Sequence, residues 1–383
     1  MNVFVQPDDG VAPVIKAIQR AKQTIRILIF RFDRGDIEKA LVAAVNRGVA
    51  VSALIAYTNR GGEKHLRELE LRLLAAGVTV ARTADDLVRY HGKMLIVDDT
   101  ELLVLAFNFT VNDIERSRSF GVSIRNAALV RDAVELFEAD TRRQPYTPGD
   151  HGLVVSPLNA RRELDAYIGK AKKELLIYDP HIGDLNIVRT LEERAKAGVS
   201  VRILGRLTRK AAHVDVHGLA SMRLHTRAIL RDSEWLFIGS QSLRTAELDA
   251  RREVGVIVRD PEAVKIIART FEKDWADALA ARPEDAEDAP PAAKVAKKVA
   301  KAVTKSLPPV APAIEVAVRK IVGREVDVTL DAEELEDTVK QAVAQAVKDV
   351  VHELVEEVVE PDDVTDPVTE KASYRKRARP LRF

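Results

Sequence analysis

The chain has 383 residues, of which 46% are hydrophobic and 31% are charged, a balance typical of a soluble globular protein with room for two ordinary domains. Its formal net charge is +1, so the chain as a whole is not built to coat nucleic acid or an acidic membrane. It contains no cysteine, which excludes a disulfide scaffold, a thiol nucleophile and a thiolate metal site.

The N-terminal residues, MNVFVQPDDG, have neither a basic start nor an apolar run of signal-peptide length. Nowhere do 18 apolar residues follow one another without a charge, so no transmembrane segment is predicted. The expected location is cytoplasmic. Peripheral attachment to a membrane stays open because the far C-terminus is basic.

Segments with helical spacing alternate with short apolar runs along the first 82 residues. Helices are predicted at 12–22, 36–47 and 63–76. Strands are predicted at 25–32, 49–57 and 78–82. Continuous apolar strands separated by helices indicate a mainly parallel sheet that is covered on both faces.

The same series returns after residue 155. AKQTIRILIF at 21–30 matches AKKELLIYDP at 171–180, an offset of 150 that a second match, 46–55 with 196–205, shares. RYHGKMLIVDD at 89–99 matches RLHTRAILRDS at 223–233 with an offset of 134, which Gly121 and Gly255 keep. The difference of 16 residues fits the loss of the helix at 63–77 from the second copy. Two constant offsets indicate a duplication, with halves predicted at 1–150 and 151–282.

Residues 283–383 differ in composition and form a predicted tail, helical or partly disordered. PEDAEDAPP at 283–291 is typical of a linker. A lysine-rich amphipathic helix is predicted at 292–307, a longer one at 331–359, and YRKRARPLRF closes the chain. The lysine-rich helix has two interpretations, a solvated face or a contact with anionic lipid or nucleic acid. The apolar seam at 335–358 is interpreted as a packing or self-association surface.

The first copy carries the pattern H-x-K-x4-D in His91, Lys93 and Asp98. Positions two apart in a strand project to the same face, so an imidazole and an ammonium group are expected side by side. Such a pair suits a phosphodiester, because lysine neutralises the non-bridging oxygens while histidine attacks or moves a proton. A turn is predicted at Asp98–Asp99, and the returning strand brings Asn108, a further phosphate donor, to its far end.

The second copy has His225, Arg227 and Asp232 at the same spacing, followed by GSQS at 239–242 with Ser240 and Ser242. HGKMLIVDD followed by AFNFT, and HTRAILRD followed by GSQSL and RREVG, resemble the paired motifs of the phospholipase D superfamily over about residues 1–280. The resemblance implies an α/β fold, made of two α/β/α sandwich halves related by a pseudo-twofold axis.

The resemblance also implies a mechanism that needs no metal and no other cofactor. One histidine attacks phosphorus to form a phosphohistidine, the other protonates the leaving alcohol, and water or a second alcohol releases the phosphoryl group. The implied enzyme is a phosphoric diester hydrolase of the phospholipase D type, or a phosphatidyltransferase, acting on a phospholipid. Two alternatives remain, a metal-independent nuclease of the same superfamily and a catalytically silent phosphate-binding module.

Each copy departs from the family pattern in its own way. Leu105–Ala106 replaces a Gly-Ser pair in the first copy, and Arg227 and Ser242 replace lysine and asparagine in the second. The carboxylate that the family places 28 residues after the histidine is Glu253 for His225, but Ser119 for His91.

We expect Glu253 to orient His225 and expect His91 to lack such a partner. We assign His91 as nucleophile, since Lys93 and Asn108 are intact, and His225 as general acid. The reverse assignment stays open because Glu253 would make His225 the more basic ring. Asp98 and Asp232 complete the catalytic motifs, yet they are expected to fix turn geometry or hold a neighbouring cation rather than to touch substrate.

Overall fold

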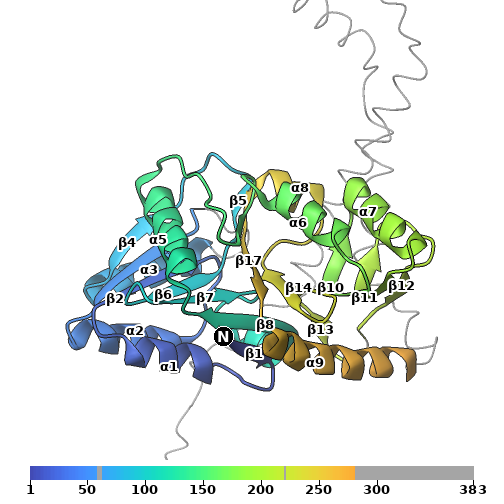
Figure 1. The fold of residues 1–383 in the computed structure, drawn as a ribbon. Coiled ribbons are helices and arrows are strands. Elements are labelled where there is room, and N and C mark those ends of the chain that lie inside the picture. The colour runs from blue at the N-terminus through green and yellow to red at the C-terminus, as the bar shows by residue number, and fades with distance from the viewer. Residues whose placement is uncertain (58–62, 220, 281–383) are drawn as a thin grey trace, which may run out of the picture. The chain divides into compact units, whose positions relative to one another are not determined.

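The computed structural model describes residues 1–57, 63–219 and 221–280, shown as coloured ribbon in Figure 1. The predicted tail, including the helices expected at 292–307 and 331–359, lies outside the described residues. None of the helices in the described ranges is long and apolar enough to span a bilayer.

The first copy alternates strands and helices as predicted. Its strands are β1 (Asn2–Gln6), β2 (Thr24–Ile29), β3 (Ala50–Ile55), β4 (Thr79–Arg82), β5 (Arg89–Tyr90), β6 (Met94–Val97), β7 (Glu101–Leu105) and β8 (Ser117–Ile124). Its helices are α1 (Ala12–Arg20), α2 (Gly35–Asn46), α3 (Glu63–Ala75), α4 (Val111–Glu115) and α5 (Ala127–Arg142). The helices and strands expected between residues 12 and 82 are confirmed to within a few residues.

The second copy repeats this order. Its strands are β9 (Leu153–Val155), β10 (Glu174–Ile182), β11 (Ser200–Leu207), β12 (Asp215–His217), β13 (Arg223–Leu224), β14 (Arg227–Arg231), β15 (Trp235–Gly239), β16 (Arg251–Arg252) and β17 (Val254–Arg259). Its helices are α6 (Ala160–Gly169), α7 (Leu185–Lys196), α8 (Thr245–Asp249) and α9 (Pro261–Ala280). Residues 208–214, which join β11 to β12, contain no helix, so α3 has no counterpart and the predicted deletion is confirmed.

The two large sheets have the same strand order. The first runs β4-β3-β2-β6-β7-β8-β1, and the second runs β12-β11-β10-β14-β15-β17-β9. Along these two orders, the pairs β2·β3 and β3·β4 and their counterparts β10·β11 and β11·β12 are parallel. The other pairs along these two orders are antiparallel. The prediction of mainly parallel sheets is therefore wrong, because strands buried on both faces are continuously apolar in either direction.

Tight turns make these reversals, and aspartates hold them in place. Asp98 and Asp99 both have positive φ, 52° and 51°, as the two central residues of a hairpin turn require. The Asp98 carboxylate accepts backbone N–H groups from residues 22–24, at the start of β2. Asp232, with φ of 54°, binds residues 172–174 in the same way. The predicted turn at Asp98–Asp99 is confirmed.

Three hydrophobic cores lie between the layers of helices and sheets. One core lies between the first sheet and α1, α2 and α3, and another lies between the second sheet and α6, α7 and α8. The third lies between the two sheets and includes side chains from both copies, together with α5 and α9. Figure 1 shows α1 and α2 below the first sheet but α6 and α7 above the second. The related helices thus lie on opposite sides, as a twofold axis between the halves requires.

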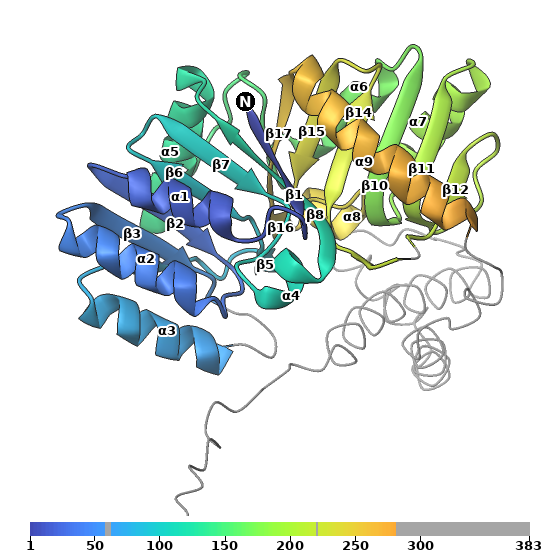
Figure 2. The same cartoon turned by 90° about the horizontal axis from the view of Figure 1, so that it is seen from below.

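The copies are joined by strand pairs as well as by the central core. The short strands β5 and β16 form a two-stranded sheet between the copies, and β13 of the second copy pairs with β8 of the first. A buried ion pair between Arg118 and Asp274, at 2.7 Å, links β8 to α9. Figure 2 shows α9 lying across the second sheet beside β1 and β8 of the first copy. The fold is therefore the α/β arrangement of two sandwiched, twofold-related halves that the sequence predicted.

Candidate active site

The two motif histidines occupy equivalent places where the copies meet. The backbone N–H groups of His91 and Gly92 donate to the carbonyl of Arg252, at 2.7 and 3.0 Å. Those of His225 and Thr226 donate to the carbonyl of Arg118 in the other copy, at 3.1 and 3.2 Å. Each histidine is therefore anchored on the neighbouring copy, and both side chains are buried.

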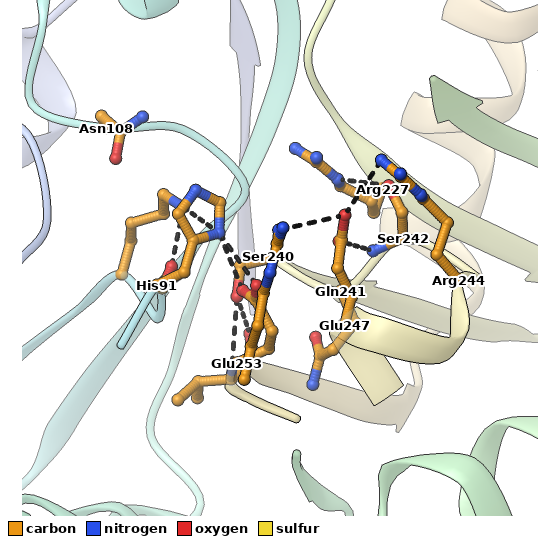
Figure 3. A network of polar contacts seen from close by, with 12 residues as sticks. His91, Asn108, Arg227, Ser240, Gln241, Ser242, Arg244, Glu247 and Glu253 are labelled. Carbon is orange, nitrogen blue, oxygen red and sulfur yellow. Dashed lines mark hydrogen bonds and ion pairs between the residues drawn. The ribbon is translucent and has the colours of Figure 1, made fainter. Parts of the chain in front are cut away.

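His91 has a charged partner at each ring nitrogen. Its Nδ1 lies 2.9 Å from Oε2 of Glu253, which is fully buried. Lys93, also fully buried, places Nζ 2.8 Å from Nε2 and 3.0 Å from Nδ1, and it donates to the His91 carbonyl at 2.7 Å. The edge of the His91 ring meets Phe30, with 4.5 Å between the ring centroids. Figure 3 shows His91 directed at Glu253 from across the junction of the copies.

The position of Glu253 corrects the sequence prediction, which paired this carboxylate with His225. Because Tyr90 is in register with Arg252 in the β5·β16 pair, the residue after Arg252 comes to lie beside the residue after Tyr90. A carboxylate 28 positions after one histidine therefore reaches the other histidine. The prediction that His91 lacks an orienting carboxylate is wrong, and Ser119 is the residue that corresponds to Glu253 on the side of His225.

His225 has a different environment. Its Nε2 lies 3.0 Å from Oδ2 of Asp113, at ion-pair distance, and its Nδ1 lies 3.1 Å from Nη2 of Arg223. Sequence reasoning named neither partner. Both keep the 134-residue offset, since Asp113 corresponds to Glu247 and Arg223 corresponds to Arg89, but this signal marks the positions without showing which ring each side chain meets.

Lys93 and Arg227 make the same backbone contact but differ in their side-chain partners. Arg227 donates through Nη1 to the His225 carbonyl at 2.8 Å, as Lys93 does to His91. Its Nε also donates to Oγ of Ser242 at 2.9 Å, a contact visible in Figure 3. Two of the predicted second-copy residues thus form a hydrogen-bonded pair beside His225.

The remaining predicted phosphate ligands lie on the loops after β7 and β15. Asn108 donates its backbone N–H and its amide Nδ2 to Asp113, at 2.8 and 2.7 Å. Ser242 donates its backbone N–H to Glu247 at 2.6 Å. The Ser240 hydroxyl accepts the N–H of Val254 at 3.1 Å. The structure brings these side chains next to the histidine partners.

Asp98 and Asp232 lie at the far ends of β6 and β14, where their carboxylates bind backbone N–H groups of the turns. The structure therefore does not bring them to the histidines. Within the described ranges, no cluster of three or more histidine, aspartate or glutamate side chains could hold a metal ion.

Burial and neighbouring charges set the protonation of the site. Burial, followed by the charge of Lys93, holds the pKa of His91 well below its ordinary value. Burial lowers the pKa of Lys93 to about 7 against the opposing charge of Glu253. Burial, and then the charge of Glu247, raise the pKa of Glu253 to about 7. His91 is therefore neutral near pH 7 and keeps a lone pair for attack.

On the side of His225, burial lowers the pKa of the imidazole to about 3, against the opposing charge of Asp113. Burial would raise the pKa of Asp113, but His225 and Arg223 outweigh it and hold that pKa well below its usual value. The charge of Arg227 lowers the pKa of both His91 and His225.

The family model described as "Cardiolipin synthase, PLD-like domain" matches residues 14–141 and 164–275. Among solved structures, a polyphosphate kinase from Porphyromonas gingivalis is similar with a TM-score of 0.60 and 19% identity over 72% of this chain and 50% of that chain. This chain thus spans half the length of that kinase. A phosphatidylserine synthase from Haemophilus influenzae is similar with a TM-score of 0.55 and 10% identity, over 72% of this chain and 86% of that chain. No match was found among curated proteins.

Proposed function

The chain belongs to the phospholipase D superfamily, and on this premise we propose that it cleaves a phosphodiester through a covalent phosphohistidine on His91. One observation carries the assignment: His91 has a carboxylate at Nδ1 and a lysine within 3.0 Å of both ring nitrogens, whereas His225 has an arginine at Nδ1 and no lysine contact within the described ranges. Glu253 fixes the ring and stabilises the positive charge that develops on it when Nε2 forms a bond to phosphorus. Lys93 can neutralise a non-bridging oxygen at the same time.

In the proposed first step, the lone pair of His91 Nε2 forms the N–P bond and the bond from phosphorus to the leaving oxygen breaks. The leaving oxygen takes a proton from the imidazolium form of His225, which the charge of Asp113 favours, and the ring becomes neutral. In the second step a water or alcohol attacks phosphorus, its proton goes to His225, and the N–P bond breaks to restore His91. The two steps need the histidines on opposite sides of one phosphorus atom, and the twofold arrangement of β5·β16 and β13·β8 supports that placement.

As the first substrate class we propose a phospholipid head-group diester, with hydrolysis or transfer to a second alcohol as the reaction. The description of the matching family model, which names a cardiolipin synthase, supports this choice. The remaining proposed phosphate contacts are Asn108, Arg227, Ser240 and Ser242, on the loops beside the two rings.

A second candidate substrate is single-stranded nucleic acid, and the charge around the site favours it. The cations that act on the two histidines are Lys93, Arg89, Arg223, Arg227 and Arg251. Four buried carboxylates, Asp113, Asp179, Glu247 and Glu253, oppose these five cations, which leaves a small positive excess. A single diester carries one negative charge, whereas a polynucleotide adds a phosphate on each side of the bond to be cleaved.

The full-length protein should be incubated in EDTA with phosphatidylcholine vesicles and ethanol, and in parallel with a single-stranded oligonucleotide. Phosphatidylethanol, measured by mass spectrometry, identifies a lipid enzyme, and shortened oligonucleotide identifies a nuclease. Either product should disappear with His91→Ala. If neither substrate reacts and no labelled phosphate is trapped on His91, although a diester still binds, the protein is the silent phosphate-binding module instead.

A further inference from the structure

His225 lacks the carboxylate that orients His91. The residue at the twofold-related position is Ser119, which is fully buried and too short to act as Glu253 does. Its hydroxyl has no hydrogen-bond partner within the described ranges. A histidine that gives and takes a proton in each cycle is expected to need a fixed ring and tautomer. The chain must supply these from elsewhere.

Asp113 is a buried carboxylate held from several sides next to this ring. Its Oδ2 accepts both donors of Asn108, and its Oδ1 accepts Nη1 of Arg223 at 2.7 Å. Its own backbone N–H donates to the hydroxyl of Thr110, the N-cap of α4, at 3.2 Å. With these contacts in place, Oδ2 lies 3.0 Å from Nε2 of His225. The side chain is only 4% exposed.

We propose that Asp113 is the positioning residue of His225, taking from the opposite side of the ring the role that Glu253 has for His91. The inference rests on the proposed function, in which His225 is the general acid. Asp113 belongs to the first copy and His225 to the second, so orientation again crosses the junction between the copies.

The two contacts of the ring define where its proton sits. A guanidinium can only donate, so Nδ1, which faces Arg223, is the acceptor in the neutral ring. The proton is then on Nε2, the nitrogen that faces Asp113. Nε2 is buried and lies 3.0 Å from Oδ2 of that carboxylate, so Asp113 faces the nitrogen that carries the ring proton.

The negative charge of Asp113 also favours the imidazolium form that His225 takes during turnover. Burial alone strongly disfavours this form, and Asp113 is the main opposing influence on the pKa of His225. Removing the charge should therefore weaken proton donation more than binding. The effect should depend on how much the leaving oxygen needs a proton.

Glu247, the counterpart of Asp113 in the second copy, shows that this position does not always serve a histidine. Glu247 also binds the loop after its strand, through Ser242. Its other oxygen pairs with Arg251 and Arg244, at 3.5 and 3.9 Å. Binding the loop is thus common to both copies, whereas the contact with a catalytic ring is the specific feature of Asp113.

The test compares two diesters of the same phosphate that differ in their leaving group, an alkyl alcohol and 4-nitrophenol, which leaves without a proton. For Asp113→Asn we expect kcat/KM to fall about 10²-fold or more with the alkyl ester and to change by less than about 3-fold with the 4-nitrophenyl ester. A merely structural role would lower both equally, and equal losses would overturn the proposal.

His225→Ala, measured with the same two esters, separates this inference from the proposed function. If His225→Ala shows no dependence on the leaving group, His225 is not the general acid and the proposed function fails. If His225→Ala shows the dependence and Asp113→Asn does not, only the role of Asp113 is wrong.

Two further variants guard against a folding effect. Thr110→Ala removes the cap of α4 but keeps the carboxylate, so we expect any loss to be the same for both esters. Asp113→Glu keeps the charge and should recover much of the activity toward the alkyl ester that Asp113→Asn loses. A glutamate variant as poor as the asparagine variant on that ester alone would contradict a role for the charge.

Discussion

The two copies share a backbone frame and differ in the partners of their histidines. Strand order, the aspartate-held turns and the carbonyl that anchors each histidine are the same in both. Around the rings, however, His91 has Glu253 and Lys93, whereas His225 has Asp113 and Arg223. The comparison teaches that the frame can stay symmetric while the chemistry of its two half-sites diverges.

This divergence suits the proposed reaction, which is not symmetric. A displacement at phosphorus needs one group with a free lone pair and another with a proton to give. Two identical half-sites would favour the same protonation state in both rings. Different partners at Nδ1 and Nε2 allow one ring to attack while the other donates. The first three of the following experiments change these differences, and the last changes a feature that the copies share.

The largest effect is expected from the histidines themselves. His91→Ala should lower kcat/KM by about 10⁴-fold or more with every leaving group, because the covalent step is lost. His225→Ala should be much less damaging with a 4-nitrophenyl ester. Rapid quenching with a labelled substrate should trap a phosphoenzyme with His225→Ala and none with His91→Ala. If the His91→Ala protein were labelled instead, His225 would be the nucleophile and His91 the general acid.

Substitutions of Glu253 and of Ser119 should differ strongly in their effect on kcat. Glu253→Gln keeps the shape of the side chain but removes the charge that faces Nδ1 of His91, and we expect kcat to fall by about 10²-fold. Ser119→Ala removes a hydroxyl with no hydrogen-bond partner in the described ranges, so kcat should change by less than about 2-fold. Steady-state kinetics of both variants check this contrast, and a loss with Ser119→Ala as large as with Glu253→Gln would contradict it.

The charge of Lys93 should depend on pH near neutrality, whereas the charge of Arg227 should not. Burial lowers the pKa of Lys93 to about 7, so the cationic form that neutralises phosphate is lost as the pH rises through about 7 in the free enzyme. Arginine stays charged over this range. Lys93→Arg should therefore move the alkaline limb of the kcat/KM profile upward, even if the maximum falls by about 10-fold. An unmoved limb would show that another group controls it.

The sequence predicted the parts of the site that depend on spacing within a single copy and that appear again in the other copy. The offsets of 150 and 134 revealed the duplication, and the spacing from His91 to Lys93 and to Asp98 located the motif. These features survive in the sequence because each lies within a strand or a tight turn. Spacing within a copy carries this information directly.

The partners that cross between the copies were not predictable in the same way. Glu253 lies beside His91 only because β16 pairs with β5 in a particular register, and no spacing within one copy encodes that pairing. The direction of the strands was missed for a related reason, since burial on both faces removes the alternation that would mark an antiparallel strand. Asp113 keeps the 134-residue offset to Glu247, but an equal distance along the chain does not say which ring a side chain meets.

The smallest effects should come from the turns, where the copies are alike. Asp98→Asn and Asp232→Asn each remove a charge that binds three backbone N–H groups, so each should lower the free energy of unfolding by about 1–2 kcal/mol at neutral pH. Backbone N–H groups outweigh burial and lower the pKa of both carboxylates below 3.8. Their contribution is therefore present above the unfolded-state pKa and is lost as the pH falls through the lower folded-state value. Denaturant unfolding should show equal losses of unfolding free energy for the two variants at pH 7 and smaller losses near pH 3. Kinetics at neutral pH should show an unchanged kcat. Unequal losses would mean that the shared frame has diverged too, and a fall in kcat with Asp98→Asn alone would mean that this turn also positions His91.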